Sequence, residues 1–238
     1  MRIECIGSGS SGNCYMLSDG ATDILIECGL TIKRIQKASG YKLSSLEGCI
    51  ISHRHGDHIK GLLQLLDKGV DCYIGQPEKG ALIEIDQRYQ HHRLKGIKPL
   101  ELFNLGTFTI LPFQVEHDTE CPLGYLIQSE LTGKKLLFAT DTYFVRYKFK
   151  GLTHLLLECN NSLEIMERNV TNGSLNGRLK QRIEKSHFSL ENVVEFLNSC
   201  DLSQLEETYL IHLSDLNSDE KLFKEVIQKT TGKPVYVF

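Results

Sequence analysis

The chain has 238 residues, of which 41% are hydrophobic and 24% charged, and its formal net charge is −3. This composition is that of an ordinary globular protein, and no apolar run approaches the roughly 20 residues needed to span a membrane. The weak negative charge excludes a general attraction to nucleic acid, so any such binding has to use a local basic patch.

The eight cysteines are dispersed and form no C-x-x-C pair. This pattern argues against a zinc ribbon, a redox motif or a disulfide framework, and it suits buried thiols in a reducing compartment. The N-terminus shows no signal-peptide pattern. We therefore expect a cytoplasmic protein without a membrane segment, and the sequence leaves its oligomeric state open.

Short apolar runs with branched or aromatic side chains predict β-strands. In chain order they lie at 24–28, 49–52, 107–116, 135–140, 155–159, 208–212 and 235–238. Apolar residues at helical spacing predict helices over 59–66, ending near Gly69, over 190–197, capped by Ser189, and over 222–227. Because strands and helices alternate without a linker or repeat, we expect a layered α/β fold in one domain over residues 1–238.

A dense cluster of metal-ligand side chains follows the predicted strand at 49–52. It reads His53-Arg54-His55-Gly56-Asp57-His58 and leads into the predicted helix. Three imidazoles and a carboxylate are ligands that zinc and similar divalent ions prefer. In a loop, His53 and His55 can share one ion, while Asp57 and His58 can reach a second. The alternative is a solvated polar loop, but H-x-H-x-D-H is a specific pattern.

This motif resembles the signature of the metallo-β-lactamase superfamily. The resemblance implies an α/β fold of the αββα sandwich type, in which two mixed β-sheets pack face to face with helices outside. It also implies three further ligands just beyond strand ends, where His117, Asp141 and His212 occur in the family's order. The implied set for two divalent ions is His53, His55, Asp57, His58, His117, Asp141 and His212. Zinc is the expected ion, with manganese or iron as alternatives. One departure is Glu27, where the family usually has Asp supporting the metal loop.

Further segments resemble one branch of this superfamily, the YycJ/WalJ-like DNA exonucleases. They lie at 7–13, 117–125, 157–160, 186–189 and 212–214, so the resemblance covers nearly the whole chain. It implies a phosphodiesterase in which two ions share a hydroxide that attacks phosphorus. Asp57 would orient the hydroxide, and His187 or His212 could supply the leaving-group proton, with a carboxylate such as Glu158 able to tune His187 as a general acid. For His187 and Glu158 a purely structural role is the alternative.

Two regions are candidates for substrate binding. Gly7, Gly9 and Gly12 spell G-x-G-x-x-G, but a strand rather than a helix is predicted next, which excludes a dinucleotide site. The loop amides could instead cradle a phosphate, with Ser8, Ser10, Ser11 and Asn13 as candidates, or form a hairpin without a ligand. Residues 145–185 hold eight Lys or Arg against four Glu. This bias predicts DNA backbone contacts by Arg178, Arg182 and Lys185, with a solvated helix face as the alternative.

The metal ligands alone do not select the substrate. The same site could attack the carbonyl of a lactone, thioester or lactam, which makes a small-molecule acyl hydrolase the second interpretation. A metal-binding protein without catalysis is the third. DNA remains the expected substrate because of the branch resemblance and the basic segment.

Overall fold

The computed structural model describes all 238 residues, and the chain divides into two compact units. The first unit comprises Met1–Gln114 and Thr119–Lys134, and the second comprises Val115–Asp118 and Lys135–Phe238. The expectation of one domain over residues 1–238 is not tested by this division and stays a prediction. None of the helices combines the length and apolarity that crossing a membrane requires.

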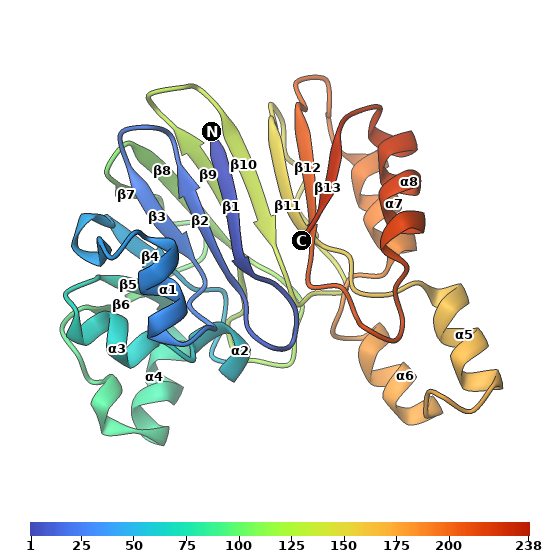
Figure 1. Cartoon of the computed structure of the whole chain (residues 1–238), viewed down its shortest axis with the longest axis horizontal. Helices are drawn as coiled ribbons and strands as arrows, with labels where there is room; N and C mark the ends of the chain where they lie inside the picture. The colour runs from blue at the N-terminus through green and yellow to red at the C-terminus, as the bar shows by residue number, and fades with distance from the viewer. The chain divides into compact units, whose positions relative to one another are not determined.

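Nine strands and four α-helices make up the first unit (Figure 1). The strands are β1 (Arg2–Gly7), β2 (Cys14–Ser18), β3 (Asp23–Ile26), β4 (Gly48–Ile50), β5 (Cys72–Gly75), β6 (Leu94–Ile97), β7 (Phe103–Leu105), β8 (Phe108–Gln114) and β9 (Leu123–Ser129). The helices are α1 (Ile32–Ala38), α2 (Gly56–Ile59), α3 (Leu62–Asp67) and α4 (Gln76–Ile85), with 3-10 turns at Leu43–Ser45 and Gln87–Tyr89.

A mixed six-stranded sheet in the order β1-β2-β3-β4-β5-β6 forms the centre of this unit. Strands β1 to β3 pair antiparallel, and β3 to β6 pair parallel. All five residues of β2 are buried, which means that both faces of the sheet are covered. Alternate residues such as Cys14, Met16 and Leu25 pack with the helices in one apolar cluster.

Strands β7, β8 and β9 form antiparallel pairs that pack against this sheet. The Tyr125 hydroxyl of β9 donates to the Ile51 carbonyl at 2.6 Å, and the Thr107 amide donates to Thr22 Oγ1 at 3.0 Å. The first unit therefore has the expected face-to-face packing of β-layers, with helices on the outer face.

The helix expected over 59–66 is two short helices, α2 and α3. They are separated near Gly61, whose amide donates to the Cys28 carbonyl at 2.8 Å. A Cβ at Gly61 would lie 2.7 Å from the Leu30 carbonyl oxygen. This close backbone contact interrupts the helix, and the prediction of one continuous helix was wrong. The predicted end at Gly69 is confirmed, since its φ of 89° is left-handed.

The second unit is built on four parallel strands (Figure 1). They are β10 (Lys135–Ala139), β11 (His154–Glu158), β12 (Glu207–Ile211) and β13 (Val235–Val237). The helices are α5 (Leu163–Thr171), α6 (Gly177–Glu184), α7 (Leu190–Ser199) and α8 (Glu220–Thr231), and α7 and α8 lie side by side. Every residue of β11 is buried, as expected for a central parallel strand.

Candidate metal centre

The metal loop lies in the first unit, between β4 and α2. His53 and His58 are buried, and His55 precedes the first residue of α2 in an extended conformation. The Nε2 atom of His53 lies 2.9 Å from Nδ1 of His55. Nε2 of His58 lies 3.4 Å from Oδ2 of Asp57. The two pairs named by the sequence are therefore pairs in space, and each brings together two atoms of the kind that bind a divalent ion.

Polar side chains behind the loop orient these ligands. Ser52 Oγ contacts Nδ1 of His53 at 2.9 Å. The buried Glu27 accepts from the Ser52 amide at 3.0 Å through Oε1, and its Oε2 lies 3.3 Å from Nδ1 of His58. Contacts of this kind fix the ring orientation of a metal-binding histidine. Glu27 thus supports the loop despite its extra methylene relative to the Asp usual in the family.

Asn13 has surroundings different from those expected of a substrate-binding residue. It is buried, and its side-chain nitrogen Nδ2 lies 3.3 Å from both Oδ2 of Asp57 and Nε2 of His58. Its Oδ1 accepts from the Gly9 amide at 2.9 Å, which ties the Ser/Gly loop to the metal loop. This burial argues against direct substrate contact and favours a role in holding Asp57 and His58.

Ser10 and Ser11 are exposed and line an open pocket of about 450 Å³ together with Gly56, Asp57, Ile59, Lys60 and Tyr89. Ser8 lies apart from these lining residues, and its Oγ accepts from the Tyr15 hydroxyl at 3.0 Å. Lys60 and Tyr89 were not identified from the sequence, because a lone lysine and a lone tyrosine carry no motif. Their place beside Asp57 makes them candidates for contact with the substrate.

A second cluster of ligand atoms lies in the second unit, at the carboxyl ends of β10, β11 and β12. Asp141, Glu158, His187 and His212 each place one ligand atom within 4.8 Å of the others. Because β10, β11 and β12 are parallel, their carboxyl ends meet at one edge. His187 reaches the same place from the segment that precedes α7.

Glu158 organises this cluster by contacting both histidine rings through one oxygen. Its Oε1 lies 2.7 Å from Nδ1 of His187 and 2.8 Å from Nδ1 of His212. Asp141 Oδ1 lies 3.1 Å from the same atom of His187 and 3.2 Å from that of His212. Since Nδ1 of each ring faces carboxylates, metal ligation or proton transfer falls to Nε2.

Charge in this cluster is shared between the carboxylates and His187. Burial disfavours the imidazolium form, but the Glu158 charge, with help from Asp141, outweighs it and raises the pKa of His187 to about 10. Burial also disfavours the Glu158 carboxylate, but the His187 charge holds the pKa of Glu158 below its usual value. The partly exposed His187 and the buried Glu158 therefore form an ion pair.

Asp141 and His212 have left-handed backbones, with φ of 46° and 55°. Glu27 shares this feature, with φ of 65°. Such a conformation costs a non-glycine residue about 1 kcal/mol or more and persists where the surrounding structure fixes it. Three of the five non-glycine residues with a left-handed backbone therefore lie at the predicted metal centre, the other two being Tyr41 and Leu100.

His117 lies in the second unit beside the end of α6. Its Nδ1 is 3.2 Å from the Ser186 carbonyl oxygen, and its ring centroid is 6.1 Å from that of His187. Arg182 of α6 lies 3.7 Å from Asp118, the residue after His117. Arg178, Arg182 and Lys185 are all exposed. These three cations are therefore open to solvent.

The donor set fits a divalent ion, because imidazoles and carboxylates converge and carboxylates hold several rings from behind.

A family model for the beta-lactamase superfamily domain matches residues 22–213. The chain is 30% identical to exodeoxyribonuclease WalJ of Streptococcus pneumoniae serotype 2 (strain D39 / NCTC 7466), over 93% of this chain and 84% of the relative. It is 24% identical to exodeoxyribonuclease YycJ of Bacillus anthracis, over 93% of this chain and 86% of the relative.

A solved structure shows the same fold. The metallo-beta-lactamase fold protein YhfI from Bacillus subtilis superposes with a TM-score of 0.70 at 19% identity, covering 99% of this chain and 95% of that one. Fold and donor set define the class as metal-dependent hydrolases. The chain belongs to the beta-lactamase superfamily, which confirms the resemblance and the fold class expected from the sequence.

Proposed function

We propose that the chain is a divalent-metal-dependent exonuclease that degrades DNA from an end. The observation that carries this proposal is the similarity to exodeoxyribonuclease WalJ over 93% of the chain. The metal loop, the late Asp and His ligands and the His187–Glu158 pair all fall inside the family match at 22–213.

In this proposal the seven ligands named from the sequence hold two divalent ions. The ions, once bound, would supply an activated water and offset charge on the phosphoryl oxygens. Asp57 contacts Asn13 and His58, so its carboxylate is held in place to orient the attacking water. Zinc remains the expected ion, with manganese or iron as alternatives.

His187 is proposed to protonate the leaving sugar oxygen. Its Nδ1 is engaged by Glu158 at 2.7 Å, which orients the ring and favours its charged form. The proton would leave from Nε2, and Glu158 would stabilise the ring by remaining ionised. A pair of an imidazolium with a buried carboxylate is suited to this task because the alkoxide leaving group is a strong base.

Two surfaces support nucleic acid as the substrate. Ser10, Ser11 and Lys60 line the open pocket beside Asp57 and are proposed to contact a phosphate. On α6, Arg178, Arg182 and Lys185 follow at helical spacing and present three cations to solvent. A small neutral lactone or lactam would need neither surface.

The test is activity of zinc- or manganese-loaded protein on defined single- and double-stranded DNA and RNA, beside a lactone, a thioester and a lactam. Shortening of DNA from one end is expected. Rapid hydrolysis of an acyl substrate with all nucleic acids intact would overturn the proposal. Metal binding without turnover of any substrate would favour a non-catalytic metal protein.

Salt dependence tests the basic surface separately. Binding of duplex DNA is expected to weaken with salt, with a log–log slope of about −0.9 per phosphate contacted. Changing Arg178, Arg182 and Lys185 together to Ala should flatten this slope and leave the metal content unchanged. Lys221→Ala with Lys224→Ala and Lys229→Ala, which removes three exposed cations of α8, is the matched control and should leave the slope as it is. An unchanged slope in the triple variant would remove α6 from the DNA-binding surface.

A further inference from the structure

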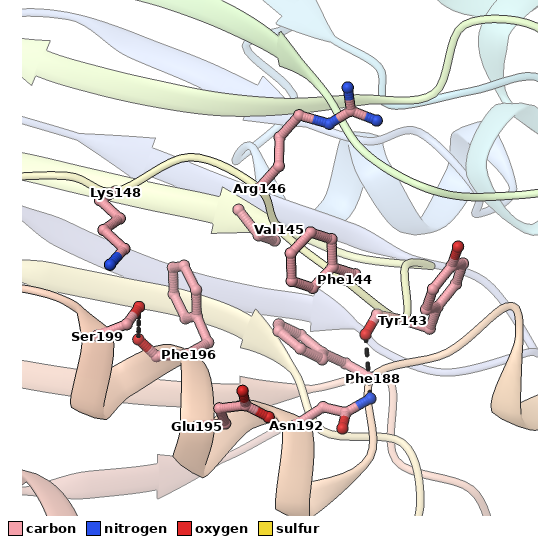
Figure 2. A pocket seen from close by; sticks show the side chains of 10 residues that line it. All are labelled: Tyr143, Phe144, Val145, Arg146, Lys148, Phe188, Asn192, Glu195, Phe196 and Ser199. Atoms are coloured by element: carbon pink, nitrogen blue, oxygen red, sulfur yellow. Dashed lines mark hydrogen bonds between the residues drawn. The ribbon is translucent and has the colours of Figure 1, made fainter.

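A cavity of about 310 Å³ in the second unit has no place in the proposed reaction so far. It is lined by Tyr143, Phe144, Val145, Arg146, Lys148, Phe188, Asn192, Glu195, Phe196 and Ser199, and is called the aromatic pocket here (Figure 2). Its volume is at the lower end of the range for small-ligand sites. The rings of Phe144, Phe188 and Phe196 surround the same space in Figure 2.

The aromatic pocket combines a buried floor with an exposed aromatic wall. Phe188 and Phe196 are buried and form part of the α7 side. Phe144 is 53% exposed and Tyr143 is 37% exposed. The Tyr143 ring points away from the three phenylalanine rings, but the exposed Phe144 ring faces them (Figure 2). Leaving the Phe144 ring in water forgoes the free energy of burying it, so its exposure points to a ligand that covers it.

The pocket is attached directly to the candidate catalytic cluster. Oε2 of Glu158 accepts hydrogen bonds from the Thr142 and Phe188 amides, both at 3.1 Å. These two amides begin the two walls of the pocket, while Oε1 of the same carboxylate holds His187 and His212. The side-chain Nδ2 of Asn192 then joins the walls by donating to the Tyr143 carbonyl at 3.1 Å (Figure 2).

Polar groups at the rim select the chemical class of the ligand. Lys148 brings a cation to one side of the pocket, while the Arg146 side chain points away from the three rings and pairs with Glu116 (Figure 2). Asn192, Glu195 and Ser199 offer hydrogen-bonding groups along α7. Aromatic walls, hydrogen-bonding groups and a nearby cation are the combination that binds a base with its phosphate in single strands.

We propose that the aromatic pocket receives one unpaired nucleobase of the substrate, close to the phosphodiester that is cleaved. This inference rests on the proposed nuclease function and adds a requirement to it, because a base can enter only when it is unpaired. Phe144 stacks on the base, and Lys148 contacts an adjacent phosphate. The enzyme therefore prefers a frayed or single-stranded end to a fully paired one.

The test combines a substitution in the protein with the removal of single bases from the ligand. Binding of labelled single-stranded oligonucleotides by the metal-loaded protein is measured by fluorescence anisotropy, with phosphorothioate linkages in the strands so that none is degraded. One abasic nucleotide is placed at each position in turn. Loss of the base that occupies the pocket should weaken binding by wild type roughly 5- to 150-fold, the range for one base–aromatic stack.

Phe144→Ala should weaken binding of the intact strand by a similar factor. An abasic nucleotide at that one position should not weaken binding by this variant any further. Phe144→Tyr, which keeps the ring, should bind like wild type, and Phe144→Leu should resemble Phe144→Ala. Leu163→Ala is the control, because Leu163 is 40% exposed and lies outside the pocket lining. A mispaired duplex end should bind wild type better than a paired end, and this advantage should shrink in Phe144→Ala.

Three results overturn the inference. In the first, wild type degrades DNA but Phe144→Ala binds every oligonucleotide as tightly as wild type does. The pocket then takes another ligand, such as an apolar side chain of a protein, and the nuclease function stands. In the second, the fold-losses in affinity from Phe144→Ala and from the abasic nucleotide multiply at every position, so the two changes act independently. Phe144 then does not contact a base. A wild-type protein that neither binds nor degrades nucleic acid defeats the proposed function, and the inference with it.

Discussion

The two units provide candidate metal ligands in opposite ways. In the first, His53, His55, Asp57 and His58 lie within six residues of a single loop. In the second, Asp141 and His212 are separated by 70 positions and meet because β10, β11 and β12 run parallel. A loop can hold adjacent ligands with local contacts, whereas dispersed ligands depend on strand register and on the left-handed turn at each strand end.

The supporting groups differ in the same way. Several short polar contacts hold the metal loop, from Asn13, Glu27 and Ser52. A single carboxylate, Glu158, holds the second cluster through hydrogen bonds to two rings and two amides. We therefore expect the first region to tolerate loss of one supporting contact better than the second.

The largest effect on activity is expected from a ligand in the loop. Asp57→Ala should abolish turnover and retain the fold, because Asp57 is half-buried at the junction of a loop and a helix and its removal takes no volume from the core. Elemental analysis and thermal unfolding of the purified variant measure metal content and stability. Near-wild-type turnover, or an unfolded variant, would contradict the role assigned to Asp57.

In the second region, His187→Ala should lower kcat by about 100- to 10,000-fold, the usual contribution of a general acid. Metal content should stay at the wild-type value, which separates this variant from Asp57→Ala. A substrate with a more acidic leaving group, such as a p-nitrophenyl phosphodiester, needs less protonation of that group. The fall in kcat caused by His187→Ala should therefore be smaller on such a substrate. An equal loss on both substrates would show that His187 does not protonate the leaving group.

A smaller effect is expected at Glu27, behind the loop. Glu27→Gln keeps the length of the side chain but removes its charge beside His58, and loss of such a supporting contact typically lowers metal affinity or activity 10- to 100-fold. Competition with a chelator of known affinity measures the change. If Glu27→Asp binds metal more tightly than wild type, the longer side chain of Glu27 lowers metal affinity relative to the Asp usual in the family.

The smallest effect on activity is expected from Asp19, which lies away from both clusters. Burial raises its pKa, but hydrogen bonds from Thr107 and Ser129, at 2.5 and 2.7 Å, outweigh this and lower the pKa from 3.8 to about 2. The folded state therefore gains stability above the ordinary pKa and loses it as pH falls toward 2.

Asp19→Asn should destabilise the protein by about 2 kcal/mol at neutral pH, a typical value for hydrogen bonds to a charged group. It should also remove part of the acid-dependent loss of stability and leave turnover unchanged. Urea unfolding between pH 2 and pH 7 measures this, with Glu225→Gln on the exposed face of α8 as control. Equal stability of Asp19→Asn and wild type at neutral pH would show that these hydrogen bonds contribute nothing net.

Much of the fold followed from local patterns. Each strand expected from an apolar run overlaps an observed strand, and Ser189 caps α7 as expected, accepting from the Asn192 amide. The strand after the Gly-rich loop is β2, which confirms the exclusion of a dinucleotide site. The elements that were missed include β1, β5, β6 and α4 to α6. Several of these are short or half-exposed, and the periodicity of a short segment is a weak signal.

The sequence alone determined the metal loop, because the spacing of four ligands within six residues is itself a geometric constraint. It also supplied the late ligands, but only through resemblance to a family, since one His or Asp after a strand is usually structural. The tertiary structure decided what depends on side chains distant in sequence. It assigned Asn13 to the support of Asp57, joined Glu158 to His187 and His212, and formed the aromatic pocket between segments 143–148 and 188–199. Burial and contact at such distances arise from packing, and a one-dimensional pattern does not encode which surfaces meet.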